Sequence, residues 1–325
     1  MLMEILQVSA LTTVQDTGRQ GVRCYGVGAG GAMDTFSVRL GNLMLGNAED
    51  AAVLEISMPP FRVRFEQSTA ICLTGADFGA RLDGQPFSPG WAWPVEGGQV
   101  LELTRPVCAA RAYLCVAGGV DVPVVLNGRG THLRGGFGGF EGRQLRKGDR
   151  LMAEQPRRML RRRYGVQLAE LAMLPRPHRP TVTRVRAMPA GEYERFTLKA
   201  REAFWSSEWQ LSTQSNRMGL RLMHADARLL LEAPLEMQSH GIMPGVVQVP
   251  PGGTPIVLMA DTNVQGGYPK IAAVISADLW RVAQIPLGAR LTFERVDRGT
   301  AVAALRAQEQ WLESVRQRVD TWVLD

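Results

Sequence analysis

Cysteine is scarce in this sequence, with four in 325 residues. None of Cys24, Cys72, Cys108 and Cys115 forms a CxxC pair or has the spacing of a metal site. The last three lie within apolar runs, where a thiol behaves as a small hydrophobic side chain. The sequence therefore predicts neither a disulfide framework nor a zinc centre, and it favours a reducing, cytoplasmic location.

Long hydrophobic runs are missing as well. The first eight residues have neither the positive charge nor the long apolar core of a signal peptide. No apolar run elsewhere is long enough to span a bilayer. We therefore expect no leader segment and no membrane partner.

The common motifs of nucleophilic, phosphate-binding and zinc catalysis are also absent: there is no G-x-S-x-G, no Walker A loop and no HExxH. The four histidines share no metal-ligand spacing, so no metal site is predicted. Residues 26–31 match GxGxxG, and a helix is predicted to follow. However, Asp34 at the N-cap would occupy the positive helix end that a pyrophosphate needs, and no βαβ unit follows. A dinucleotide site is therefore not predicted.

The formal net charge of +6 raises the question of an anionic partner. Nucleic-acid binding requires basic side chains on one face with aromatic side chains interleaved. The densest basic run, residues 147–163, is followed by a single aromatic residue, Tyr164. A solvated linker or a contact face for another subunit explains this run better, so no nucleic-acid partner is predicted.

Short apolar runs separated by glycine-rich turns fill most of the chain and predict a mainly β fold. Two weak internal matches occur in the same order: residues 78–82 resemble 218–222, and residues 112–117 resemble 255–260. The spacing within each half is nearly equal, which favours one barrel design used twice.

The chain is expected to have four segments. These are an N-terminal β-barrel lobe at 1–155, an Arg/Pro-rich linker at 156–180, a C-terminal β-barrel lobe at 181–296 and an amphipathic helix at 297–325. In the helix, Leu305, Leu312 and Val319 recur at every seventh position and form an apolar seam. The seam either packs on the protein's own barrel or joins a partner or a second copy of the chain, and the sequence leaves both open.

Residues 215–270 hold most of the polar side chains that suit a binding site. Polar, glycine-rich turns alternate here with short apolar runs, the pattern of a β-barrel whose loops gather at one mouth. The glycines let the backbone approach a ligand closely. The predicted substrate-binding residues of this stretch are Asn216, Arg217, Gln248, Gln265, Gly266, Gly267 and Tyr268.

Asn216 and Arg217 form the first polar turn of this stretch. An asparagine beside an arginine can hold a ureido or lactam group while the guanidinium pairs with a carboxylate. Alternatively, Arg217 forms a salt bridge across the loop and Asn216 caps a turn. Arg134, in the glycine-rich loop of the first lobe, is predicted to reach an anion where the lobes meet.

Asp261 and Lys270 are the predicted catalytic residues. Asp261 ends a buried strand, where a carboxylate is either a base or orienting group or an acceptor for loop N–H groups. Lys270 follows two glycines and Tyr268, and its ammonium can neutralise an anionic carboxyl or phosphoryl group. Gln248 lies between valines of a strand as an inward polar group, and His240 is not predicted to be a general base.

Several segments resemble those of a known family. They are S-N-R-M-G at 215–219, H-G-I-M-P-G-V-V-Q-V-P at 240–250, G-G-Y-P-K-I-A at 266–272, T-T-V-Q-D at 12–16, G-A-M-D at 31–34, L-T-G-A-D at 73–77 and L-R-G-G-F-G-G at 133–139. This set is similar to the KipA-like family, which includes biotin-dependent carboxyltransferase-type proteins, the second subunit of allophanate hydrolase and the C subunit of the ATP-hydrolysing 5-oxoprolinase.

The resemblance implies two related lobes of the cyclophilin-like β-barrel type. It also implies the role of the C subunit in an ATP-dependent 5-oxoprolinase, which opens 5-oxoproline to glutamate together with a KipI-like and a LamB/YcsF-like subunit. The substrate would be a small lactam or amide, and ATP would act in the assembled complex, with its site on this or another subunit.

The same resemblance leaves two other activities open. One is carboxyl transfer from carboxybiotin to urea or a related amide. The chain lacks an Ala-Met-Lys-Met segment for biotin attachment, so a separate carrier would bring the biotin. The other is regulation of a KipI-like partner without catalysis. The loop at 261–269 departs from the family's D-R/C-Q-T-T/S-G-G-Y-P pattern, which leaves the substrate open.

Overall fold

The computed structural model describes residues 2–156, 160–166 and 182–322, and most of the predicted linker at 156–180 lies outside them. Contacts between residues divide the chain into two compact units. Unit 1 comprises Met1–Gly21, Gly30–Ala172 and Glu309–Asp325, and unit 2 comprises Val22–Ala29 and Met173–Gln308. The prediction of a mainly β chain is confirmed, while the lobe boundaries stay a prediction.

Unit 1 contains two sheets. The first has the strand order β11 (Val120–Asp121), β12 (Arg150–Ala153), β1 (Leu2–Gln7), β4 (Phe61–Phe65), β9 (Val100–Leu103), β6 (Arg81–Leu82) and β7 (Gln85–Pro86). The second has the order β13 (Tyr164–Gly165), β8 (Trp91–Val95), β5 (Thr69–Asp77), β10 (Cys108–Val116), β3 (Val53–Ile56) and β2 (Thr13–Gln15). In β4, buried Phe61, Val63 and Phe65 alternate with half-buried arginines, so one face of that sheet meets the core.

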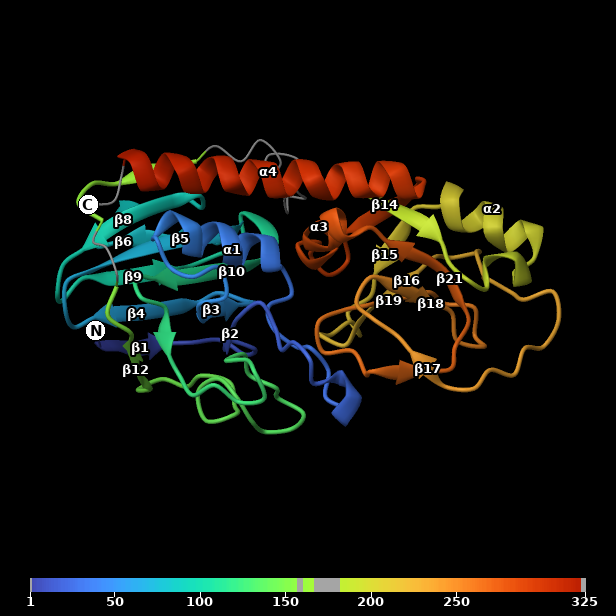
Figure 1. Cartoon of the computed structure of the whole chain (residues 1–325), viewed down its shortest axis with the longest axis horizontal. Coiled ribbons are helices and arrows are strands. Elements are labelled where there is room, and N and C mark those ends of the chain that lie inside the picture. The colour runs from blue at the N-terminus through green and yellow to red at the C-terminus, as the bar shows by residue number, and fades with distance from the viewer. Residues whose placement is uncertain (1, 157–159, 167–181, 323–325) are drawn as a thin grey trace. The chain divides into compact units, whose positions relative to one another are not determined.

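Helix α1 (Thr35–Met44) lies against β5 and β10 (Figure 1). Asp34 caps the helix as predicted, because its Oδ1 accepts a hydrogen bond from Ser37 N at 2.9 Å. Gly41 faces the sheet so closely that an added Cβ would lie 2.4 Å from Cys115 Sγ. Close packing of helix on sheet therefore requires a residue without a side chain at this position.

The C-terminal helix α4 spans Arg298–Trp322, and its last part belongs to unit 1. Leu312 in this part is 2% exposed, whereas Leu305, one heptad earlier, is 37% exposed. The ring of Trp311 lies 5.7 Å from that of Phe36 on α1. Of the two alternatives for the apolar seam, its second half packs on the protein's own unit 1.

An ion pair joins α4 to α1 inside unit 1. Arg39 donates to both carboxylate oxygens of Glu309 at 2.6 Å. This hydrogen-bonded pairing lowers the pKa of Glu309 below its ordinary value. The part of α4 that belongs to unit 1 is thus held by both apolar packing and charge.

Unit 2 is built around a closed barrel. Its strand order is β14 (Thr183–Pro189), β21 (Lys270–Val274), β18 (Val246–Gln248), β19 (Ile256–Leu258), β16 (Gly219–Met223), β15 (Trp209–Leu211) and β22 (Arg290–Arg295), with only β14 and β22 pairing in parallel. Helix α2 (Leu198–Ser206) packs on β22 through Phe204, whose ring stacks on Phe293 at 4.5 Å. The barrel closes the edges that an open sheet would expose.

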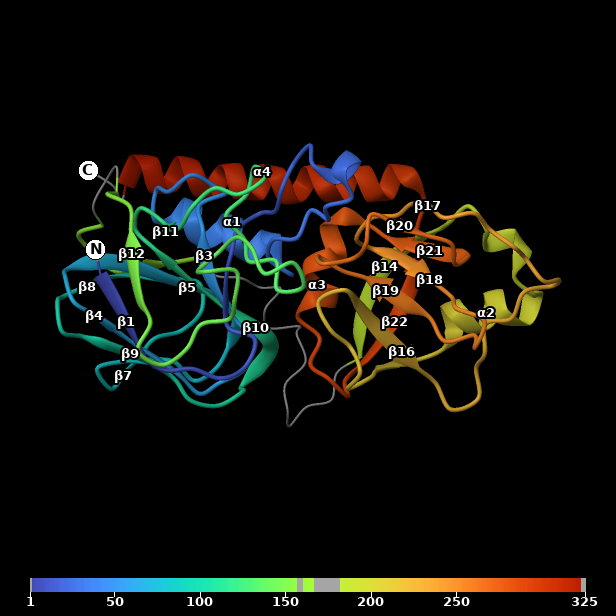
Figure 2. The same cartoon turned by 90° about the horizontal axis from the view of Figure 1, so that it is seen from below.

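Short elements complete unit 2. They are α3 (Leu279–Ala283), the 3₁₀ turns at Arg23–Tyr25, Tyr193–Arg195 and Ser276–Asp278, and a ribbon of β17 (His240–Gly241) and β20 (Gln265–Gly266). Figure 2 shows this ribbon at one side of the barrel. Across all the residues described, the helices are too short or too polar to cross a bilayer.

Candidate functional site

Arg217 and Asp261 form a two-pronged ion pair in unit 2. Arg217 lies in the loop before β16, and Asp261 follows β19, the strand that pairs with β16. Arg217 Nε donates to Asp261 Oδ2 at 2.8 Å, and Nη2 donates to Oδ1 at 3.0 Å. Arg217 is 7% exposed, so the pair is largely shielded from water. This is the salt bridge that the sequence offered as the alternative to carboxylate binding.

Asn216 has a turn-capping position. Its Oδ1 accepts hydrogen bonds from the backbone N–H of Met218 at 2.8 Å and of Gly219 at 3.3 Å. A short polar side chain that bonds its own backbone in this way stabilises a turn. That Asn216 binds the substrate stays a prediction. Because its Oδ1 is used in the turn, such binding would use the side-chain NH₂ group.

Lys270 stands at the centre of a second polar group. Its Nζ lies 2.9 Å from Glu192 Oε2 and contacts His240 Nε2. Glu192 Oε2 also accepts the backbone N–H of Lys270 at 3.0 Å. The other ring nitrogen of His240, Nδ1, lies 3.0 Å from the carbonyl oxygen of Gln238. Three chain segments that are distant in sequence thus converge on one ammonium.

Gln248 belongs to the same cluster, and we call Lys270, Glu192, His240 and Gln248 together the Lys270 group. Gln248 and Lys270 are directly opposite in the β18–β21 pairing, so their side chains point to the same face of the barrel wall. Gln248 Nε2 donates to the carbonyl oxygen of Tyr268 at 3.4 Å. A Cβ at Gly266 would lie 2.9 Å from Gln248 Nε2, so the β17–β20 ribbon covers this face.

The strand register separates these two groups, where the sequence predicts a common rim. Arg217 and Asp261 lie beyond Leu258, the last residue of β19. Lys270 pairs with Gln248, whose other neighbour is Ile256 at the start of β19. Ile256 and Leu258 are two residue steps apart along the strand, a distance of about 7 Å. Loop 261–269 runs from one group to the other.

The rest of the predicted loop opens on an apolar cavity. Gly267 and Tyr268 line a cavity of about 580 Å³, together with Leu229, Leu230, Leu231, Glu232, Ala233, Pro234, Leu235, Val249, Pro250, Pro251 and Pro269. Tyr268 is 49% exposed, and Gln265 is exposed in β20. This cavity suits the apolar part of a small ligand. Arg134 is exposed in unit 1, and its place in the site stays a prediction.

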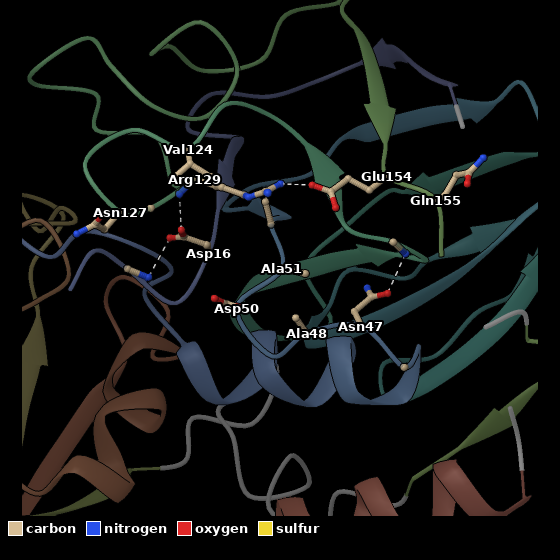
Figure 3. A pocket seen from close by; sticks show the side chains of 15 residues that line it. Asp16, Asn47, Ala48, Asp50, Ala51, Val124, Asn127, Arg129, Glu154 and Gln155 are labelled. Carbon is tan, nitrogen blue, oxygen red and sulfur yellow. Dashed lines mark hydrogen bonds and ion pairs between the residues drawn. The ribbon is translucent and has the colours of Figure 1, made fainter. Parts of the chain in front are cut away.

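Unit 1 has a cavity of its own, of about 310 Å³ (Figure 3). Asp16 on its wall is 4% exposed, with Oδ1 accepting from Gly18 N at 2.9 Å and Oδ2 from Arg129 N at 2.5 Å. The Arg129 guanidinium pairs with Glu154. Because Asp50 adds a third carboxylate, the lining suits an ammonium or amidinium group better than an anion.

Sequence reasoning missed two members of the Lys270 group. Glu192 lies in no recognisable motif, and only the folded chain brings it to Lys270. His240 is visible in its motif and is not predicted to be a base, and its contact with Lys270 gives it a different candidate role. The contact of His240 with Lys270 depends on the β17–β20 pairing, which places His240 opposite Gly266 and which the sequence does not predict.

Comparison with known proteins identifies the family. Residues 25–295 match the carboxyltransferase domain, subdomains A and B. The chain belongs to the carboxyltransferase domain family. This carboxyltransferase-domain protein is 42% identical to the C subunit of 5-oxoprolinase from Escherichia coli K12, over 98% of its own length and 99% of that protein. It is 41% identical to the Haemophilus influenzae protein of the same name, over 98% and 99% of the two chains.

Larger proteins of the family match over a fraction of their length. The crystal structure of the K. lactis urea amidolyase superposes with a TM-score of 0.86 at 27% identity, covering 97% of the present carboxyltransferase-domain protein and 20% of that chain. The urea amidolyase of Lachancea kluyveri is 28% identical over 96% of this chain and 18% of that protein. The fold of both units thus recurs as one part of a much longer enzyme.

Proposed function

We propose that this chain is the C subunit of an ATP-dependent 5-oxoprolinase. The observation that carries the proposal is the match from end to end with two proteins of that name, at 42% and 41% identity. The urea amidolyases are less similar in sequence, and the match covers a fifth or less of their length. The chain would act with a KipI-like and a LamB/YcsF-like subunit, and ATP would be hydrolysed in the complex.

The Lys270 group supplies chemistry that suits a lactam with a carboxylate. Opening the ring of 5-oxoproline breaks the C–N bond and adds water, and negative charge develops on the carbonyl oxygen on the way. An ammonium held at a fixed point stabilises either that oxygen or the substrate's own carboxylate. Gln248, beside Lys270, offers an amide that can pair with the lactam group.

Reconstitution tests the proposal. The chain would be combined with its KipI-like and LamB/YcsF-like partners, and glutamate formation from 5-oxoproline would be measured with and without ATP. Turnover that requires ATP and this chain supports the proposal. Lys270→Ala should lower turnover about a hundredfold, to a residual rate that can still be measured, without preventing assembly. The matched control Lys199→Ala, at an exposed position of α2, should leave turnover unchanged.

Carboxyl transfer from carboxybiotin is the second candidate, favoured by the TM-score of 0.86 with the K. lactis urea amidolyase. In that case turnover should appear only when a separate biotinylated carrier, bicarbonate and urea or a related amide are supplied. A complex that assembles with a KipI-like protein and turns over neither substrate would instead support a regulator without catalysis. The three outcomes exclude one another in the same set of assays.

A further inference from the structure

We propose that Glu192 and His240 are positioning residues, which hold the Lys270 ammonium in one orientation and leave one of its N–H groups for an anionic oxygen of the ligand. The inference rests on the proposed function for the identity of the ligand. Its geometric part, the fixation of Lys270, stands on unit 2 alone. Neither Glu192 nor His240 belongs to the residues that the sequence assigns to the site.

His240 is held in one tautomer by its neighbours. Its Nδ1 lies 3.0 Å from the carbonyl oxygen of Gln238, which can only accept a hydrogen bond. Nδ1 therefore carries the hydrogen, and in the neutral ring Nε2 is left with its lone pair. Nε2 is the atom that contacts Lys270 Nζ. The imidazole is thus an acceptor for the ammonium, and not a base that faces the ligand.

Lys270 has more hydrogen-bond donors than its two neighbouring acceptors use. An ammonium has three N–H groups. Within the described part of the chain, Nζ contacts two acceptors, Glu192 Oε2 and His240 Nε2. The side chains of Lys270 and Glu192 are 14% and 19% exposed, so water competes little for the pair. One N–H group is left for a third acceptor, which the proposal assigns to a carboxylate or oxyanion of the ligand.

The Lys270 side chain is held rigidly by Glu192 and His240. Glu192 Oε2 also accepts the backbone N–H of Lys270 at 3.0 Å, so one carboxylate fixes both ends of the lysine. His240 is held by the pairing of β17 with β20, in which it lies opposite Gly266. A lysine side chain in water is flexible, and fixing it before the ligand arrives removes an entropic cost from binding or reaction. Both partners thus act through Lys270.

Three substitutions test which atoms of Glu192 and His240 hold Lys270. Glu192→Gln keeps an amide oxygen that can accept the backbone N–H but removes the charge beside Nζ. His240→Gln retains an acceptor near the place of Nε2, whereas His240→Asn retains only a group near Nδ1. Glu194→Gln is the matched control, because Glu194 lies in the 3₁₀ turn that begins directly after Glu192 and its side chain is 76% exposed.

The first measurement needs no turnover. The full chain is treated with acetic anhydride, and the rate of acetylation at Lys270 is followed by peptide mass spectrometry, with Lys199 as the internal reference. Acetylation requires that the reagent reach the nitrogen, and Lys270 Nζ is largely buried and held against Glu192 and His240, so Lys270 should react slowly. We expect at least a fivefold faster rate in Glu192→Gln and His240→Asn, and a rate within twofold of wild type in His240→Gln and Glu194→Gln. Equal rates in all variants would overturn the inference.

The second measurement uses the reconstituted enzyme. Positioning through Lys270 predicts that Glu192→Gln adds no further loss of kcat/KM once Lys270 is alanine, whereas an independent structural role predicts losses that multiply. His240→Gln should recover most of the activity lost in His240→Asn. If no 5-oxoproline turnover is found with wild type, the proposed function fails, while the acetylation rates still decide whether Lys270 is held. Multiplying losses would overturn the positioning role.

Discussion

Replacing Arg217 tests two roles: hydrogen exchange measures its contribution to stability, and turnover measures its place in the site. The Arg217–Asp261 pair has two hydrogen bonds of 2.8 and 3.0 Å, between side chains that are 8% and 14% exposed. Removing one partner of a buried ion pair leaves the other charge unpaired and costs about 3–5 kcal/mol. Because Asp261 retains some contact with water, we expect about 3 kcal/mol for Arg217→Ala, a change of about a hundredfold in the opening equilibrium.

Hydrogen exchange read by mass spectrometry measures this effect in unit 2 alone. The amides of Met259 and Asp261 donate to the carbonyl oxygens of Met218 and Arg217 at 3.0 Å, so their exchange reports opening between β16 and β19. Arg217→Ala should raise their exchange about a hundredfold. The matched control is Arg290→Ala, because the Arg290–Glu208 pair has side chains 61% and 47% exposed and such pairs contribute under about 1 kcal/mol.

A double-mutant cycle completes the test. If the two charges stabilise the loops only as a pair, the Arg217→Ala/Asp261→Ala variant should be more stable than the sum of the single losses predicts, by about 1–3 kcal/mol. Additive losses would refute the reasoning. In the reconstituted enzyme, Arg217→Ala should abolish turnover while the complex still assembles. Turnover at the wild-type level in this variant would remove Arg217 from the site.

Three further predictions concern unit 1. Leu312→Ala should destabilise unit 1 by about 2–5 kcal/mol because it leaves a cavity under α4, whereas the control Leu305→Ala, at a 37% exposed position in the part of α4 that belongs to unit 2, should cost under about 1 kcal/mol; thermal unfolding compares the two. Gly41→Ala should cost about 1–3 kcal/mol although alanine favours helices, since its Cβ would meet Cys115 Sγ, and adding Cys115→Ala should recover most of the loss in urea unfolding. The lowered pKa of Glu309 means that its ion pair stabilises the folded state above the ordinary value of 4.5, and that this contribution is lost as the pH falls through the lower folded value. A pH titration of α4 hydrogen exchange should show this loss in wild type and not in Glu309→Gln.

The parts of the fold that depend on local pattern were predictable. Asp34 was expected to cap a helix because of its place before an apolar repeat, and it does so. The heptad spacing of Leu312 and Val319 indicated a C-terminal helix with an apolar seam, and both side chains are buried. Alternating apolar residues likewise indicated strands. These features follow from interactions between residues a few positions apart.

The grouping of the site residues was not predictable in the same way. Whether Arg217 meets Asp261 depends on the antiparallel register of β16 and β19, which joins positions 44 residues apart. The sequence named Lys270 but could not name Glu192, because their contact bridges 78 residues and no motif marks the glutamate. Long-range pairing thus decides which polar side chains share a ligand, and a list of motif residues does not contain it.

The central claim is that this carboxyltransferase-domain chain works as the C subunit of a 5-oxoprolinase. The most direct measurement is glutamate formation from 5-oxoproline by the chain reconstituted with its KipI-like and LamB/YcsF-like partners, with ATP and without any biotinylated carrier. The account predicts glutamate and ADP in equal amounts, and loss of both products when this chain is omitted. Product formation that continues without this chain, or that requires a biotinylated carrier and bicarbonate, would contradict it.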